Sequence, residues 1–212
     1  MNNNLLTTAE FDQLIARFGI RPTPSSETRE WNLSSLAGRF VELSSAEETA
    51  SLTAAMSLVC ESQLRGEPAA WIAVGDSIFF PPDAADSGVD LTALPVIRTP
   101  DTKTAVRAAD RLLRSKGFGL ITLDLGPKSA MRVSVQTRLA GLARKHGTAL
   151  LCLTRKGHHT ASIGSLVSIR GRTRVKKTGF NKFTWEIEIL KDKRLGPGWY
   201  HAGVCCGPDG LC

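Results

Sequence analysis

Apolar residues in the middle of the chain occur in short unbroken runs, separated by stretches in which they recur every three or four positions. Unbroken apolar runs are typical of strands buried on both faces, and we predict strands over residues 39–43, 70–74, 96–98, 119–123 and 148–153. The intervening periodicity is helical, and we predict helices over residues 46–64, 102–116 and 132–146. This alternation predicts an α/β fold with a largely parallel sheet flanked by helices.

The pattern changes after residue 160, where polar and apolar residues alternate with a period of two. Such alternation is typical of strands with one face in the core, and we predict strands over residues 163–170, 172–178 and 183–190. Gly171 and residues 179–181 supply the turns between them. These strands predict a C-terminal antiparallel extension of the sheet. The glycine-rich residues 193–212 are predicted to form a flexible tail.

Residues 1–33 are predicted to form a short helix and a polar linker outside the core, which we place at residues 34–192. Four apolar residues recur there at helical spacing, namely Phe11, Leu14, Ile15 and Phe18. A helix this short is not stable alone in water, so we expect its apolar face to dock on the core or on a partner chain. Trp199 and Tyr200 are candidate partner anchors in the tail, because large amphipathic side chains dominate many interfaces.

Charge is distributed unevenly along the chain. The net charge is +7, but residues 1–125 hold 11 Lys and Arg against 16 Asp and Glu, whereas residues 126–201 hold 16 against 3. A basic segment of this kind favours nucleic acid or an acidic protein surface as a partner. A basic face that serves only solubility is the alternative.

The candidate nucleic-acid-binding residues are Arg155, Lys156, Arg170, Arg172, Arg174 and Lys176. In a strand, the last four of these residues share one face and Lys177 lies on the other. Four cations in a row can neutralise several phosphates, which predicts weak, salt-dependent binding without sequence preference.

The sequence indicates no metal site and no membrane segment. No apolar run reaches the roughly 18 residues of a membrane span, and the first residues lack the pattern of a signal peptide, so we expect a cytoplasmic protein. The three cysteines after residue 200, together with His201, match no familiar zinc spacing. Cys60 and Cys152 lie in apolar stretches and are expected to be buried thiols. His158 and His159 are adjacent and are expected in a solvated loop.

The segment from Ser44 to Leu52 lies where α/β nucleotide-binding proteins carry their phosphate loop. Such a loop needs glycines that let the backbone surround the phosphates, a lysine, and a hydroxyl that reaches magnesium, in the pattern G-x-x-x-x-G-K-[ST]. This segment contains neither glycine nor lysine, and Glu47 and Glu48 would repel a triphosphate. We therefore expect no nucleotide cofactor. The serines of this segment have no partner histidine at a recognisable spacing, so we also expect no enzymatic activity.

From Gly38 onward the chain resembles the core of RecA, the bacterial recombinase, and the resemblance covers about residues 34–192. The run GRFVEL resembles the strand that leads into the RecA phosphate loop. In an ungapped alignment, Ser45 and Ala50 stand where that loop has glycines, Ser51 where it has its lysine, and Leu52 where it has its hydroxyl. The resemblance therefore implies a degenerate nucleotide site.

Later motifs extend the resemblance. Asp76, after AWIAVG, stands in the place of the RecA catalytic glutamate, and Asp124, at the end of GLITLD, resembles its second magnesium-organising carboxylate. The run RLAGLARKHGTALLCLTR resembles the helix and strand before the second DNA-binding loop. That loop is reduced here to residues 156–161, and the first loop to residues 126–131. The resemblance thus implies a RecA fold without an intact ATP site or intact filament DNA loops.

A known bacterial family combines these features, and the chain resembles it: the RecA/SulA-like ImuA proteins of mutagenesis cassettes. The resemblance implies a non-catalytic adaptor or RecA modulator in damage-induced, error-prone translesion synthesis. The implied partners are RecA, a catalytically inactive relative of the Y-family polymerases, and an error-prone C-family polymerase. Self-association, weak DNA binding and a location at the nucleoid are further expectations. A SulA-like inhibitor of cell division and a stand-alone nonspecific DNA-binding module are the alternative functions.

Overall fold

The structure is a computed structural model that describes residues 30–45, 50–75, 77, 79–126, 129–157, 160–179 and 182–206. Its helices are α2 (Leu33–Leu36), α3 (Ala50–Leu64), α4 (Pro81–Asp86), α5 (Thr102–Ser115) and α6 (Val133–His146), with a 3-10 turn at Leu91–Ala93. Its strands are β1 (Phe40–Ser44), β2 (Ala69–Val74), β3 (Val96–Thr99), β4 (Leu120–Gly126), β5 (Ala149–Thr154), β6 (Ile169–Lys177), β7 (Lys182–Asp192) and β8 (Tyr200–Cys206).

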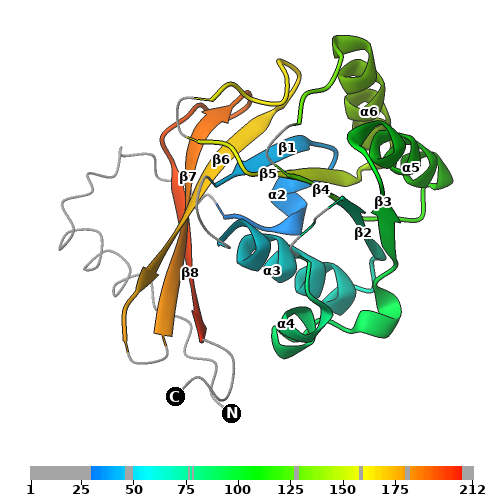
Figure 1. Cartoon of the computed structure of the whole chain (residues 1–212). Helices are drawn as coiled ribbons and strands as arrows, with labels where there is room; N and C mark the ends of the chain where they lie inside the picture. The colour runs from blue at the N-terminus through cyan, green and yellow to red at the C-terminus, as the bar shows by residue number, and fades with distance from the viewer. Residues whose placement is uncertain are drawn as a thin grey trace.

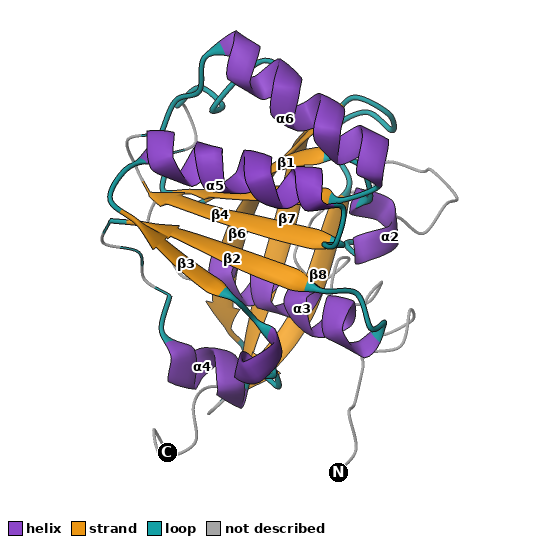
Figure 2. Cartoon of the chain, turned by 90° about the vertical axis from the view of Figure 1, so that its right-hand side faces the viewer, coloured by secondary structure: helices purple, strands orange, loops and turns teal. Residues whose placement is uncertain are grey.

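The strands form one sheet in the order β3-β2-β4-β5-β1-β6-β7-β8. Every pair from β3 across to β6 is parallel, whereas β7 runs antiparallel to both β6 and β8. Helices α5 and α6 cover one face of the parallel strands, and α3 and α4 lie on the other (Figures 1 and 2). This architecture confirms the predicted α/β class, with a largely parallel sheet and a C-terminal antiparallel extension, and it is consistent with a RecA-like core.

Each face of the sheet has its own hydrophobic core. On one face, α3 packs Ala54 and Leu58 against Val41 and Trp71 of the strands. On the other face, α5 and α6 pack against residues such as Phe40. Because β1 and its parallel neighbours are buried on both faces, their sequences show unbroken apolar runs rather than alternation.

The ends of α5 and α6 follow from local sequence. The side chain of Asp101 caps α5 by accepting a hydrogen bond from the N–H of Thr104 at 2.7 Å. Gly147 follows α6 in the left-handed conformation, with φ of 71°, which glycine adopts without strain. The predicted bounds of these two helices are therefore within one residue of the observed ones.

Two predictions for the antiparallel extension are wrong. Residues 163–170 were predicted as a strand, but β6 begins at Ile169, and the preceding residues Ile163 and Val167 pack among the side chains of the α5–α6 core. Gly171 was predicted as a turn, but it lies inside β6. A Cβ at Gly171 would lie 2.7 Å from Cγ2 of Ile187 and 2.8 Å from Cδ2 of Leu43, so glycine serves close packing there rather than a turn.

The predicted flexible tail is also wrong for the residues that the structure describes up to residue 206. After β7, Asp192 forms a buried ion pair with Arg39 at 2.5 Å and accepts hydrogen bonds from the backbone of Arg194 and Leu195. Trp199 is only 8% exposed, and its indole N–H donates to Asp192 at 3.3 Å. Strand β8 then pairs with β7. The glycine-rich composition did not predict this strand, because β8 is stabilised by its pairing with β7 and by side-chain packing rather than by local strand propensity.

The start of the described chain packs on the same strand. The backbone N–H of Trp31 donates to Nδ1 of His201 in β8 at 3.4 Å, and the Trp31 indole N–H donates to the carbonyl of Ala54 in α3 at 3.4 Å. Burial lowers the pKa of His201 below its ordinary value, which favours the neutral ring that accepts this hydrogen bond. Trp31 and Leu33 therefore belong to the core, although they precede the predicted core boundary at residue 34.

Other predictions fall outside this description. The predicted N-terminal helix with Phe11, Leu14, Ile15 and Phe18 lies outside the described residues. None of the described helices is both long and apolar enough to span a bilayer.

The close packing at Gly171 gives a test of β6. Replacing Gly171 with Ala should destabilise the protein by about 1–3 kcal/mol, because the new methyl group overlaps Ile187 and Leu43. Urea unfolding measures the change. Gly141→Ala is the matched control: Gly141 lies within α6 with nothing within 4 Å of a Cβ, so its replacement should stabilise the protein by up to about 1 kcal/mol. A neutral Gly171→Ala would show that Gly171 is not packed as described.

Candidate functional site at the carboxyl ends of the parallel strands

The carboxyl ends of β1, β5, β4 and β2 lie next to one another at one edge of the sheet, where α/β proteins bind ligands. After β1, the N–H of Ser45 donates to the carbonyl of Thr154 at the end of β5, at 3.1 Å. Ser45, Ala50 and Ser51 are buried, and Leu52 packs partly buried against the α3 side of the core. The described residues that the sequence resemblance aligns with the RecA phosphate loop are therefore small or apolar side chains that are buried or partly buried in the fold. Glu47 and Glu48 lie outside the described residues.

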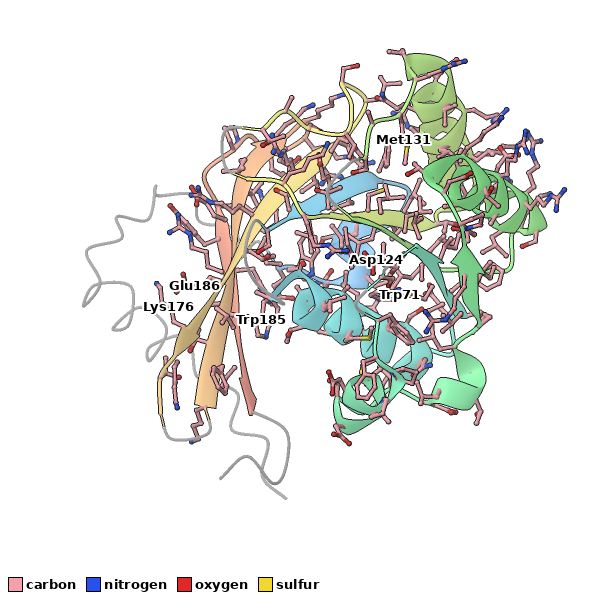
Figure 3. All side chains as sticks on the ribbon, viewed as in Figure 1. Trp71, Asp124, Met131, Lys176, Trp185 and Glu186 are labelled. Carbon is pink, nitrogen blue, oxygen red and sulfur yellow. The ribbon has the colours of Figure 1, made fainter. Side chains whose placement is uncertain are left out.

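Asp124 is the carboxylate at this edge that the structure describes (Figure 3). It lies within β4 rather than at its end, since the strand continues to Gly126. The hydroxyl of Ser77 donates a hydrogen bond to its carboxylate. Burial raises the pKa of Asp124 above its ordinary value, while the hydrogen bond from Ser77 and the positive charge of Arg155 oppose that rise. The carboxylate thus already has a hydroxyl donor and a nearby cation. Asp76 lies outside the described residues.

A second carboxylate, Glu42 in β1, organises the polypeptide beyond β5. Its side chain is fully buried and accepts hydrogen bonds from the N–H of Ile163 at 3.1–3.2 Å and from the hydroxyls of Thr154, at 3.1 Å, and Ser162. Arg170 stands directly opposite Glu42 in the β1–β6 register, and its Nε lies 3.9 Å from the carboxylate. Glu42 therefore joins β1, β5, β6 and the segment before β6 through one buried charge. Sequence reasoning missed it because it appeared as a single polar residue in an apolar run.

Two of the predicted nucleic-acid-binding residues contribute to this buried region. Lys156 is only 8% exposed, and its Nζ donates to the carbonyl of Ala161 at 3.3 Å. Burial lowers the pKa of Lys156 below its ordinary value, although the charge of Glu42 opposes this. Arg170 donates to the carbonyl of Thr160 at 2.7 Å. Both side chains hold the segment before β6 in place, which leaves little of Lys156 for a phosphate.

The remaining basic residues of β6 lie on one face, as their alternation predicted. Residues 170, 172, 174 and 176 are partly or fully exposed, and the residues between them from Ile169 to Val175 face the core. Strand β7 places acidic residues beside them (Figure 3). Arg172 pairs with Glu188, with Nε 3.1 Å from the carboxylate, and Nζ of Lys176 lies 3.0 Å from both oxygens of Glu186. Arg174 is exposed.

The three acidic residues of the basic segment, residues 126–201, thus all form ion pairs. Glu186 and Glu188 neutralise Lys176 and Arg172, and Asp192 neutralises Arg39. The β6 row consequently carries less net positive charge than its sequence suggests. A hairpin centred on residue 180 would have predicted the pair of Arg172 with Glu188, whereas Glu186 stands opposite Arg174 in the register and reaches Lys176 diagonally.

Potential metal ligands do not gather in the described chain. Among the described residues, no group of three or more His, Cys, Asp or Glu side chains is placed to hold a metal ion. Cys152 is buried, as predicted, whereas Cys60 is only partly buried, with its sulfur 3.3 Å from the carbonyl oxygen of Ser87.

Comparison with known proteins gives one consistent relationship. RecA of Rickettsia africae (strain ESF-5) is 31% identical over 137 residues, which are 62% of this chain and 39% of that protein. RecA of Rickettsia prowazekii (strain Madrid E) is 33% identical over 132 residues, or 59% of this chain and 38% of that protein. RecA of Rickettsia conorii (strain ATCC VR-613 / Malish 7) is 32% identical over 132 residues. No protein-family model matches the chain.

The sheet order and the partial similarity together define a RecA-like α/β protein. The similarity is distant, and the chain spans about two fifths of the length of the curated relatives that it matches. The particular relationship that the comparisons support is thus with RecA proteins.

The buried carboxylate of Glu42 gives a second test. Glu42→Ala should destabilise the protein by about 3–5 kcal/mol, because it leaves Arg170 without its carboxylate and the Ile163 N–H without its acceptor. Glu42→Gln keeps an acceptor oxygen and should cost less, about 1–3 kcal/mol. Urea unfolding of both variants measures the order. An alanine variant within about 1 kcal/mol of the wild type would contradict the network.

Proposed function

We propose that this chain is an ATP-independent, RecA-like accessory protein of the DNA damage response. It acts as an adaptor or a modulator of RecA in error-prone translesion synthesis, through contacts with other proteins. The observation that carries this proposal is the segment after β1, where the RecA-like fold needs glycines and a lysine for phosphates and this chain has buried Ala50 and Ser51 instead.

The state of Asp124 supports the same conclusion. A carboxylate that organises magnesium must be ionised and open to the ion. Here it is buried, its pKa is raised, and it accepts a hydrogen bond from Ser77. A nucleotide would therefore find no lysine at the phosphate loop position and an already engaged carboxylate beside it.

The proposed partners are RecA, a catalytically inactive relative of the Y-family polymerases, and an error-prone C-family polymerase. Residues Phe11, Leu14, Ile15 and Phe18 remain the predicted contact for RecA or for self-association. Tyr200 remains a predicted partner anchor, since its side chain is 37% exposed on β8, whereas the burial of Trp199 argues against a direct role for that residue. A weak contact between DNA and the β6 face is part of the same proposal.

The first test of this function is nucleotide binding. Isothermal titration of the full chain with ATP and magnesium should give no measurable affinity, with a RecA protein as the positive control. Ser51→Lys should not restore binding, because the segment would still lack the glycines that surround phosphates. Micromolar affinity in the wild-type chain would overturn the ATP-independent role.

The second test concerns the partners. Removal of residues 1–20 should reduce the RecA retained in a pull-down, or reduce self-association, and Tyr200→Ser should reduce retention of the polymerase relative. Deletion from residue 196 is unsuitable, because it removes β8 and the packed Trp199. Val204→Ser, also on β8 and 45% exposed, is the control for loss of an apolar side chain on that strand. If both variants bind every partner like the wild type, the assigned contacts are wrong.

A further inference from the structure

Helix α5 carries a row of cations along its outer face. Lys103, Arg107, Arg111 and Arg114 recur three or four positions apart, and all four are exposed. With 3.6 residues per turn, these positions lie opposite the buried Ala105, Ala109 and Leu113, which face the sheet. The charged row therefore points directly away from the core.

Helix α6 extends this basic surface. Its exposed cations are Arg138, Arg144 and Lys145, and Asp110 is the single acidic residue within α5 and α6. Asp110 lies between the helices, 3.0 Å from Nε of Arg114 and 2.9 Å from Nε of Arg138. This bridge joins the two helices, which lie side by side over the sheet (Figure 2), with nitrogen-tipped side chains projecting outward (Figure 3). Seven Lys and Arg residues against one Asp make this layer strongly electropositive.

The contrast with β6 shows which basic surface keeps its charge. On β6, Glu186 and Glu188 each neutralise one cation of the row. On α5 and α6, the lone Asp110 leaves most of the cations uncompensated within the two helices. Residues 1–125 have a negative net charge, because the acidic residues outside α5 outnumber the cations of that helix. The net charge of this part of the sequence therefore did not reveal the basic surface of α5.

We propose that the outer face of α5 and α6 binds duplex DNA through its phosphate backbone, without reading sequence. Successive cations on α5 are about 6 Å apart along the helix axis, close to two phosphate steps of about 3.4 Å each on one DNA strand. Arginine predominates in the row, and its planar guanidinium suits phosphate oxygens.

An acidic protein partner fits this face less well. Protein interfaces centre on apolar or aromatic anchors, and among the residues of α5 and α6 the one large exposed apolar side chain is Val133, the first residue of α6. Neither helix contains Phe, Tyr or Trp, and the one imidazole is His146 at the last position of α6, so bases of a single strand would find no row of stacking rings there. These features favour the backbone of a duplex. The inference does not depend on the proposed adaptor role.

The test compares two triple variants of equal charge in the full chain. Lys103→Gln, Arg107→Gln and Arg111→Gln together remove three of the four cations of the α5 row while keeping good helix formers. Lys177→Gln, Lys182→Gln and Arg194→Gln together remove exposed cations at the two ends of the β6–β7 hairpin, outside the row of residues 170, 172, 174 and 176, and serve as the matched control, the hairpin variant. Circular dichroism and urea unfolding verify that both variants remain folded. Fluorescence anisotropy with a labelled random duplex, from 50 to about 300 mM salt, measures affinity and its salt dependence.

The α5 variant should bind the duplex at least about tenfold more weakly at low salt, and the slope of log affinity against log salt should fall by about 2–3. The hairpin variant should stay close to the wild type. An unchanged α5 variant, equal losses in both variants, a larger loss in the hairpin variant, or a wild type that binds no duplex would each overturn the inference. Binding of poly-L-glutamate or a single-stranded oligonucleotide as tight as that of the duplex would overturn the assignment to duplex DNA. ATP titration and RecA pull-downs with the α5 variant should match the wild type, which separates this inference from the proposed adaptor role.

Discussion

The fold depends on the pairing of β6 with β1. Strand β6 runs parallel to β1 on one side and antiparallel to β7 on the other, so it is the strand at which the parallel sheet becomes a hairpin extension. Two residues fix this pairing: Gly171 lets Leu43 and Ile187 approach the backbone, and Arg170 lies opposite the buried Glu42. A shift of one residue would place a charged side chain in the core and remove the carboxylate from Arg170. These two residues set the register of β6 on β1, and β7 and β8 then pair in turn onto β6.

The placement of a few acidic residues decides which basic surfaces remain charged. The chain is basic overall, but Glu186, Glu188 and Asp192 compensate cations on β6 and at Arg39. The single Asp110 in the α5–α6 layer instead joins two helices while leaving their outer face positive. Charge counted along the sequence therefore describes this molecule less well than charge counted by element.

Much of the fold could be predicted because the buried parallel strands and their helices have distinct hydrophobic periods. The predictions failed where tertiary packing decides the conformation. Gly171 resembles a turn residue until its neighbours Leu43 and Ile187 are known, and β8 exists because β7 pairs with it. At the candidate site, the absence of glycine and lysine from the segment after β1 can be seen in the sequence itself. The role of Glu42, in contrast, becomes clear only from the positions of Ile163 and Arg170 in the structure. The pair of Arg172 with Glu188 could have been predicted from hairpin symmetry, whereas Lys176 pairs diagonally with Glu186, which stands opposite Arg174.

The hydrogen bond from Trp31 to His201 links residues 170 positions apart. Contacts of this range form late, because the intervening chain must be ordered first. On a ribosome that adds about 5–20 residues per second, Trp31 waits about 10–30 seconds for its partner to be made. During that interval the apolar surface that Trp31 and β8 later cover faces solvent. We expect the nascent chain to engage chaperones at this stage, so that its yield in the cell depends on when β8 emerges from the ribosome.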